Sequence, residues 1–261
     1  MQPTIDIQKI IDLARKAGDE IMKVYAQDFS VELKGDNSPL TQADQKSNGL
    51  IINGLKNLYP EIPIISEETK LTPYDKRKNW KTYWLVDPLD GTKEFIKKNG
   101  EFTVNIALMS EGRPMLGVVY APAQNKMWYG MKSEGSFFVN DDGSKVPLQK
   151  GRNWRDLQKV NVVASRSHLS DETLQFVEDL KKEGKEVDFV SSGSSLKFCL
   201  VAEGKADVYP RFAPTMEWDT AAGQAVVEIA GGIVLNWHTK QRLEYNKENL
   251  LNPFFIVEFP S

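Results

Sequence analysis

The residues of this chain that can do chemistry are carboxylates at the ends of apolar stretches. Residues 84–92 read Trp-Leu-Val-Asp-Pro-Leu-Asp-Gly-Thr, so an expected strand runs directly into Asp87 and Asp90. The proline and glycine of this stretch favour a turn, which would bring both carboxylates and the Leu89 carbonyl to face one point. Hard cations such as Mg²⁺ bind oxygen ligands of this kind. Taken alone, the same residues are equally compatible with aspartate caps around an ordinary turn.

Two further acidic positions strengthen the cation interpretation. Residues 64–68 read Ile-Ile-Ser-Glu-Glu, so Glu67 also follows an apolar strand pattern. Residues 218–223 read Trp-Asp-Thr-Ala-Ala-Gly, which places Asp219 at the start of a helix rich in small residues. Singly, a surface acid and a helix cap would explain them. Acids at three separate element ends predict a shared cation site.

The composition excludes several other chemistries. The 261 residues include 33 Lys and Arg against 36 Asp and Glu, two His and one Cys, and the net charge is −3. A single Cys cannot form an internal disulfide or a multi-cysteine metal site, and two His cannot build a three-histidine zinc site. The slightly acidic balance lacks the basic footprint of a nucleic-acid-binding protein.

The first half must position the first acids, and its pattern changes from helical to strand-like. Apolar residues at helical spacing predict helices at 5–26 and 43–58, with Thr41 or Asp44 as the cap of the second. Short β-branched and aromatic runs separated by turn residues then predict an antiparallel sheet. We expect its strands at 62–66, 82–87, 102–109, 115–120, 126–131 and 136–139.

The second half alternates strands and helices, which is typical of α/β layering. We expect strands at 160–164, 187–190, 206–209 and 233–236, and helices at 171–182, 194–203 and 219–230. The polar stretch 149–156 predicts a division into domains 1–150 and 151–261. The predicted fold is therefore an α/β layered sandwich, with N-terminal helices on an antiparallel sheet followed by a C-terminal α/β half. We interpret the basic run 76–78 as a solvated loop.

The acidic motifs resemble those of a known family. Asp87-Pro-Leu-Asp90-Gly-Thr92 and Trp218-Asp-Thr-Ala-Ala-Gly223, followed by Ala-Gly-Gly at 230–232, are similar to the signatures of the lithium-sensitive, magnesium-dependent inositol monophosphatase superfamily. The resemblance covers essentially the whole chain and implies the layered sandwich of that superfamily. It also implies a phosphatase.

Further residues narrow the resemblance to a subgroup. Inositol phosphatases continue the first motif as Thr-x-Asn-Phe, whereas this chain has Thr92-Lys-Glu-Phe95. With the stretch 193–204 and Tyr209-Pro-Arg-Phe212, it resembles the CysQ-type 3′(2′),5′-bisphosphate nucleotidases. The implied reaction converts adenosine 3′,5′-bisphosphate, a by-product of sulfate activation, into AMP and phosphate.

The resemblance implies oxygen ligands for two to three Mg²⁺ ions. Glu67, Asp87 and the Leu89 carbonyl would hold one ion. Asp87, Asp90 and Asp219 would hold a second, and a third would lie mostly in water near Glu67. Two metals together can stabilise both the attacking and the leaving oxygen of a displacement.

The same resemblance implies catalytic roles for three residues. Thr92, hydrogen-bonded towards Glu67 or Asp44, would orient the attacking water, and which of the three accepts its proton stays open. Gly91 and Thr92 would open a short helix whose free N–H groups favour the phosphate that is cleaved. Neither Cys199, expected in the core, nor a histidine is needed as nucleophile.

The second phosphate requires its own cations. Ser194, Lys197 and Arg211 match family positions near that group, although ordinary surface charge is the alternative. His168 is a candidate nucleotide contact, for which a local hydrogen bond is an equal alternative. The complete expected substrate-contacting set is Glu67, Leu89, Asp90, Gly91, Thr92, His168, Ser194, Lys197, Arg211 and Asp219.

Two other functions remain open from sequence. One is an inositol or sugar-phosphate monophosphatase, and the other is a non-catalytic metal or nucleotide sensor of the same fold. No signal peptide or membrane-spanning run is expected. We therefore expect a cytoplasmic monomer or homodimer, with association at the inner face of the cell membrane left open. The expected partner is a small nucleotide bisphosphate and not a nucleic acid.

Overall fold

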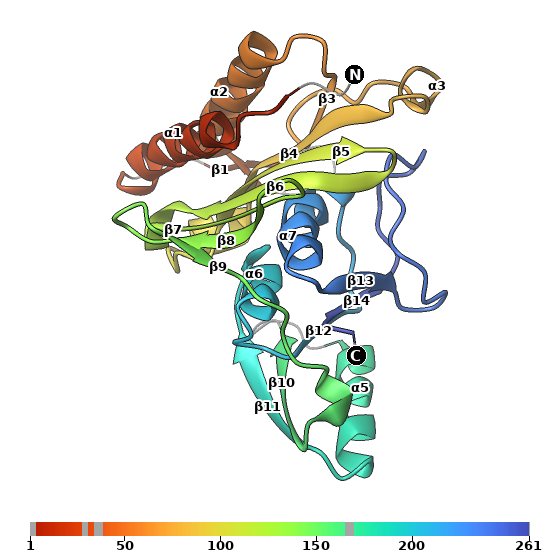
Figure 1. Cartoon of the computed structure of the whole chain (residues 1–261). Helices are drawn as coiled ribbons and strands as arrows, with labels where there is room; N and C mark the ends of the chain where they lie inside the picture. The colour runs from red at the N-terminus through yellow and green to blue at the C-terminus, as the bar shows by residue number, and fades with distance from the viewer. Residues whose placement is uncertain (1–3, 28–30, 34–38, 165–169, 261) are drawn as a thin grey trace.

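The chain folds into alternating layers of helices and sheets. A computed structural model describes residues 4–27, 31–33, 39–164 and 170–260. Two N-terminal helices cover one face of a seven-stranded sheet, two central helices separate it from a five-stranded sheet, and a further helix covers the far face of the second sheet (Figure 1). The predicted α/β layered sandwich is confirmed.

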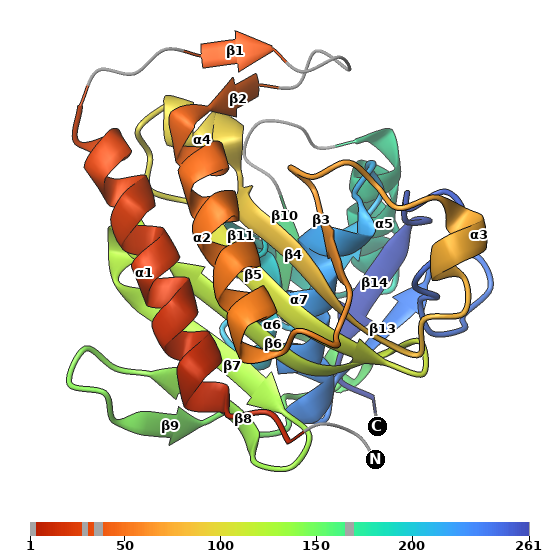
Figure 2. The same ribbon diagram turned by 90° about the horizontal axis from the view of Figure 1, so that it is seen from above.

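The first layer consists of α1 (Ile7–Tyr25) and α2 (Gln42–Leu58), which lie side by side above the sheet (Figure 2). Their bounds agree with the helical spacing of apolar residues in the sequence. On the apolar face of α1, Ile10 and Ile21 have no exposed surface. Beside the N-terminal end of α2 lies a short antiparallel ribbon of β1 (Val31–Leu33) and β2 (Pro39–Thr41) (Figure 2).

The first sheet contains its strands in sequence order. All neighbours are antiparallel except β3 and β4, which are parallel, so the prediction of an antiparallel sheet was wrong for this pair. The chain passes from β3 through α3 (Tyr74–Arg77) before it enters β4 in the same direction, whereas a tight hairpin would make the strands antiparallel. The strands are β3 (Ile64–Ser66), β4 (Thr82–Asp90), β5 (Thr103–Ser110), β6 (Arg113–Ala121), β7 (Lys126–Met131), β8 (Gly135–Val139) and β9 (Lys145–Pro147).

The second sheet has the order β11-β10-β12-β14-β13. Strands β11, β10 and β12 are parallel, and β14 is antiparallel to both β12 and β13. Helix α5 (Asp171–Lys182) packs on the outer face of this sheet. The sequence prediction omitted β14. The strands are β10 (Lys159–Ala164), β11 (Glu186–Ser191), β12 (Val208–Arg211), β13 (Ile233–Asn236) and β14 (Phe255–Glu258).

The central layer is formed by α6 (Leu196–Ala202) and α7 (Glu217–Ile229). Gly117 and Gly130 of the first sheet allow α7 to approach closely, because a Cβ atom on Gly117 would lie 2.4 Å from the Ala222 carbonyl oxygen. One buried apolar cluster extends from the first sheet through both helices into the second sheet. Helix α7 is therefore packed from both sides.

The basic run 76–78 differs from its prediction. Arg77 is 1% exposed, and its Nη1 and Nη2 atoms donate hydrogen bonds to Asn246 Oδ1 at 2.7 Å and to the Glu248 carbonyl at 2.8 Å. The prediction of a solvated loop was wrong for this residue because its partners lie far away in the sequence. None of the helices in the described ranges combines the length and the apolar character needed to cross a bilayer.

Candidate active site

The first acidic motif forms the end of β4. The strand register shifts between Asp87 and Asp90, and the Leu89 N–H donates to Asp87 Oδ1 at 3.0 Å. The Ser47 hydroxyl on α2 donates to the Pro88 carbonyl at 2.7 Å. The predicted turn is therefore an irregular strand end held by α2, and the Asp87 side chain lies almost fully buried within it.

Gly91 redirects the chain immediately after the motif. Its φ is +91°, and a Cβ atom would lie 3.1 Å from the Glu101 carbonyl oxygen, so this position favours glycine on two grounds. Thr92 then begins α4 (Thr92–Ile96), which confirms the predicted short helix.

Asp44 is fixed at the start of α2 by a capping box. The backbone N–H and the hydroxyl of Thr41 both donate to Asp44 Oδ2, at 2.8 and 2.7 Å. The Thr92 hydroxyl donates to Asp44 Oδ1 at 3.2 Å and lies 3.5 Å from the Leu89 carbonyl oxygen. Asp44 thus orients the Thr92 hydroxyl, and both cap residues suggested by the sequence take part in the cap.

Glu67 follows β3 and stands beside the first motif. Its backbone N–H donates to the Val86 carbonyl at 3.2 Å. Burial raises the pKa of Asp87 well above its usual range, and the carboxylates of Glu67, Asp90 and Asp219 raise it further. Acids from three separate elements therefore lie close enough to repel one another.

Asp219 is the third residue of α7. Its Oδ2 accepts a hydrogen bond from the Met216 N–H at 2.8 Å. The helix begins at Glu217, before the predicted start, so Asp219 caps it from inside the first turn. Burial raises the pKa of Asp219 well above its usual range, and the negative charge of Asp90 raises it further.

The chemistry of this acidic group fits a hard cation. Its donors are carboxylate oxygens and the Leu89 carbonyl, with no nitrogen or sulfur ligand among them. Within the described ranges, no group of three or more His, Cys, Asp or Glu side chains is arranged so that it could hold a metal ion as it stands. The repulsion that raises the pKa values of Asp87 and Asp219 would be relieved by a bound cation.

A cavity of about 230 Å³ lies beside the acids and receives residues from both halves of the chain. It brings together most of the residues expected to contact the substrate, although Glu67, Leu89 and Thr92 are not part of its lining. The residues expected from the sequence that line it are Asp90, Gly91, Ser194, Lys197, Arg211 and Asp219.

Lys197 is a buried cation in the first turn of α6, as predicted. Its Nζ donates to the carbonyls of Ser192 at 3.2 Å and Ser194 at 2.9 Å. Burial and, to a smaller extent, the neighbouring Arg211 guanidinium together lower the pKa of Lys197 to about 8. An anion in the cavity would offset both effects.

Arg211 ends β12 with part of its hydrogen-bonding capacity unused. Its Nη2 donates to the Pro214 carbonyl at 3.2 Å, while its Nε is buried and has no hydrogen-bond partner among the described residues. A guanidinium in this state is suited to an anionic ligand.

Several site residues escaped the sequence analysis. Glu94 lines the cavity and adds a further negative charge to it. Thr103 and Asn105 are buried polar residues on β5, and both belong to a cluster that reaches Asp90 through residues 194–195. The available signal was their position as polar residues in an otherwise apolar strand.

His168 and Cys199 were also singled out from the sequence. His168 lies outside the described residues. Cys199 is fully buried on α6, and burial raises the pKa of its thiol well above the usual range, so it is a core residue as expected.

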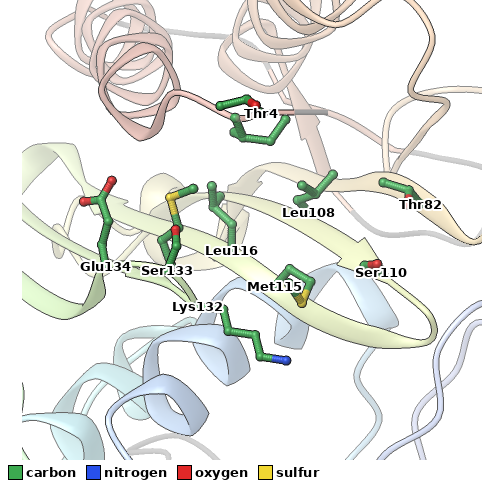
Figure 3. Close-up of a pocket in the computed structure, with 11 residues that line it drawn as sticks. Thr4, Thr82, Leu108, Ser110, Met115, Leu116, Lys132, Ser133 and Glu134 are labelled. Atoms are coloured by element: carbon green, nitrogen blue, oxygen red, sulfur yellow. The ribbon is translucent and has the colours of Figure 1, made fainter. Parts of the chain in front are cut away.

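A larger cavity of about 580 Å³ lies elsewhere, on the first sheet near the start of α1. Leu108, Met115 and Leu116 line it, together with the single acid Glu134 (Figure 3). Because its lining contains no group of carboxylates and no buried cation, this cavity is a weaker candidate for the active site than the cavity beside α7.

Comparison of the whole chain with known proteins identifies its family. The model of the inositol monophosphatase family matches residues 4–253. The chain belongs to this family. Among inositol monophosphatase family proteins, the 3′(2′),5′-bisphosphate nucleotidases CysQ of Salmonella typhimurium and of Escherichia coli strain K12 are each 48% identical to it, over 96% of this chain and 98% of theirs.

A solved structure agrees with this family assignment. The crystal structure of CysQ from Bacteroides thetaiotaomicron superimposes with a TM-score of 0.82 at 46% identity, over 97% of this chain and 96% of that chain. The resemblance of the sequence motifs to this family is confirmed.

Proposed function

We propose that this chain is a Mg²⁺-dependent phosphatase that hydrolyses adenosine 3′,5′-bisphosphate to AMP and phosphate. The observation that carries the proposal is the meeting of mutually repelling acids with the buried Lys197 and the partly buried Arg211 around one cavity. Such a site suits a substrate with two phosphates, one beside the acids and one beside the basic residues. Its relatives of 48% identity carry the name bisphosphate nucleotidase, and members of the family are metal-dependent phosphatases that typically use Mg²⁺.

The residues that would hold the metal are the acids of the two motifs and their neighbours. Two to three Mg²⁺ ions would be bound by Glu67, Asp87, Asp90, Asp219 and the Leu89 carbonyl. When bound, the ions supply positive charge that offsets the phosphate oxygens and lowers the pKa of water.

Thr92 and Asp44 provide the proposed path for a proton. The Thr92 hydroxyl donates to Asp44 Oδ1, so the lone pairs of Thr92 Oγ1 remain free to accept a hydrogen bond from the attacking water. As the water attacks, its proton moves to Thr92 Oγ1 while the threonine proton moves to Asp44 Oδ1. Two donors from Thr41 hold the other oxygen of Asp44 and keep this geometry fixed.

The second phosphate would be recognised by the basic end of the cavity. Lys197 and Arg211 would neutralise its charge, and the Ser194 turn borders it. Gly91, with no side chain, leaves room for the other phosphate at the backbone that leads into α4. His168 stays a predicted nucleotide contact.

Paired assays distinguish this function from its alternatives. Phosphate release from adenosine 3′,5′-bisphosphate is expected to exceed release from inositol 1-phosphate at equal Mg²⁺ concentration. Faster turnover of inositol 1-phosphate would support the inositol phosphatase alternative. Binding of the nucleotide without any phosphate release would support the sensor alternative.

The metal assignment has its own test. Asp87→Asn removes a negative charge from the residues that would hold the metal, so phosphate release is expected to fall by at least about 100-fold. The control is Asp75→Asn, which changes an acid whose side chain is 89% exposed on α3. Full activity in Asp87→Asn, or an equal loss in both variants, would contradict the assignment.

We also propose that the enzyme acts in the cytoplasm as a monomer or homodimer, with domains 1–150 and 151–261. Cys199, its one thiol, is buried and has no disulfide partner. Light scattering of the eluted protein measures the oligomeric state directly, and a larger assembly would contradict this expectation.

A further inference from the structure

A chain of buried polar groups connects β5 to the acidic site. Ser194 Oγ donates to Asp90 Oδ2 at 2.6 Å. Thr103 Oγ1 lies 2.5 Å from Ser194 Oγ and 2.8 Å from Ser195 Oγ. Ser195 Oγ in turn lies 2.8 Å from the terminal amide of Asn105. Four consecutive hydrogen bonds thus join Asn105 to Asp90.

Counting protons fixes the direction of this chain. The three hydroxyls of Thr103, Ser194 and Ser195 carry one proton each, yet the chain contains four hydrogen bonds. The Ser194 hydroxyl donates its proton to the Asp90 carboxylate. Thr103 must therefore donate to Ser194, and Ser195 must donate to Thr103. The fourth proton can come only from the amide nitrogen of Asn105.

The orientation of the Asn105 amide supports this count. With its oxygen turned towards Ser195, Asn105 Nδ2 is buried without a hydrogen-bond partner among the described residues. Amide oxygen and nitrogen are assigned from the surrounding hydrogen bonds. Turning the amide over gives Nδ2 an acceptor in Ser195 Oγ and supplies the missing proton in one step.

We propose that Thr103 is a positioning residue of the active site, the centre of a one-way hydrogen-bond chain that runs from Asn105 through Ser195, Thr103 and Ser194 to Asp90. This inference rests on the proposed function for its role in turnover, but the chain itself is a property of the folded protein.

The chain holds one oxygen of Asp90 and leaves the other for a cation. Asp90 Oδ2 accepts from both Ser194 Oγ and the Ser195 N–H, each at 2.6 Å. Ser194 has a φ of +52°, an unfavourable backbone for a residue other than glycine, and its hydroxyl is fixed by the donor Thr103 behind it. Through Ser194, Thr103 therefore holds both Asp90, a proposed metal ligand, and the turn at Ser194 that borders the cavity.

Thr103 is well placed to act through these neighbours alone. It has no exposed surface, and it lies opposite Asp90 in the β4–β5 register. It does not line the cavity. Its effect on the reaction must pass through Ser194 and Asp90, which distinguishes it from a substrate-binding residue.

The test compares Thr103→Val with Thr103→Ser. Valine keeps the shape but removes the donor, so calorimetric titration of the metal-free protein with Mg²⁺ should show about tenfold weaker binding. Serine keeps the hydroxyl and should restore wild-type affinity. Ser110→Ala removes another buried hydroxyl from the far end of the same strand and should leave Mg²⁺ affinity unchanged.

The outcomes separate this inference from the proposed function. Wild-type Mg²⁺ affinity in folded Thr103→Val, or no recovery in Thr103→Ser, would overturn the positioning role. If Thr103→Val does not fold, Ser195→Ala breaks the next link and should weaken Mg²⁺ binding similarly. A wild-type protein that binds Mg²⁺ but releases no phosphate would contradict the proposed function without contradicting the hydrogen-bond chain.

The direction of the chain can be observed separately. Neutron diffraction distinguishes nitrogen from oxygen and locates exchanged deuterium. We expect the Asn105 nitrogen to face Ser195 Oγ and the Thr103 deuterium to point to Ser194 Oγ. A deuterium on Ser195 Oγ directed at an Asn105 oxygen would overturn the proposed direction.

Discussion

At the scale of single residues, this site combines charges that are unfavourable without their ligands. Asp87 and Asp219 lie buried among other acids, and Lys197 lies buried beside Arg211. The pKa values of Asp87, Asp219 and Lys197 are each displaced in the direction that disfavours the charged form. A cation for the acids and an anion for the bases would reverse both effects together, so metal and substrate should each assist the binding of the other.

The charge of Lys197 leads to a prediction about pH. Its pKa of about 8 means that most molecules carry this charge at pH 7, whereas about one in ten does at pH 9. The KM for adenosine 3′,5′-bisphosphate at saturating Mg²⁺ should therefore rise by up to about tenfold as pH rises from 7 to 9. The charged groups that act on Lys197 are Asp90, Glu94, Arg211 and Asp219.

Lys197→Arg provides the matched comparison. An arginine stays charged throughout this range, so the KM of the variant should change little between pH 7 and 9. Constant KM in the wild type, or an equal rise in the variant, would contradict the role of Lys197.

The sequence was sufficient to predict site residues whose role can be inferred from their neighbours in the sequence. Asp87, Asp90 and Asp219 stand at element ends that the pattern of apolar residues located, and the turn at Gly91 was visible in its neighbours. Thr103 was not recognised, because its partner Ser194 is 91 positions away and a hydroxyl carries no charge or motif. Arg77 was misjudged for the same reason.

At the scale of elements, the placement of α7 depends on the absence of side chains beneath it. Gly117 and Gly130 lie on neighbouring strands and both meet the backbone of this helix. Since Asp219 lies in the first turn of α7, close packing in the middle of the helix sets the position of a proposed metal ligand at its end.

A methyl group at this contact should disturb both stability and activity. In Gly117→Ala, the new Cβ would lie 2.4 Å from the Ala222 carbonyl oxygen and 2.7 Å from the Ala225 Cβ. We expect a loss of about 2 kcal/mol in the free energy of unfolding, together with lower kcat as α7 shifts. Urea denaturation and phosphate release measure the two effects.

Gly49→Ala is the control for this change. Nothing lies within 4 Å of the new Cβ atom in α2, and alanine favours a helix. The variant should be as stable as the wild type or up to about 1 kcal/mol more stable. If Gly117→Ala behaved in the same way, close packing of α7 would not matter.

The boundaries of elements were less predictable than their existence. The chain before α6 was expected to be helical from 194, yet Ser194 adopts a left-handed conformation and the helix starts at Leu196. Hydrogen bonds to Asp90 from another part of the chain hold this turn, and local sequence does not contain that information. Similarly, the short apolar run of β14 does not by itself reveal its neighbours in the sheet.

At the scale of the whole molecule, the two sheets share one interior. The largest apolar cluster contains Leu85 of the first sheet, Phe198 of the central layer and Val257 of the second sheet. Arg77 adds polar connections from α3 to the segment 246–248. We therefore expect the proposed domains 1–150 and 151–261 to be stable only together.

We expect the molecule to unfold in a single transition. Arg77→Met removes the donors of the Asn246 side chain and the Glu248 carbonyl while keeping the apolar stem, which should lower the free energy of unfolding by about 2–4 kcal/mol. The slope of this free energy against urea concentration should not change.

Lys78→Met, at a neighbouring position whose side chain is 44% exposed, should have little effect. Two separate transitions in Arg77→Met, as monitored by hydrogen exchange in each sheet, would show that the halves are independent.

The position of β14 matters for synthesis on the ribosome. This strand is the last in chain order, yet it occupies the interior of the second sheet between β12 and β13. The earlier strands emerge first, and folding begins while later residues are still being added. A nascent chain that has not reached residue 255 lacks β14, which joins β12 to β13. A product interrupted there therefore exposes the unpaired edges of β12 and β13. Completion of β14 thus closes the second sheet, whereas a product interrupted earlier is suited to degradation.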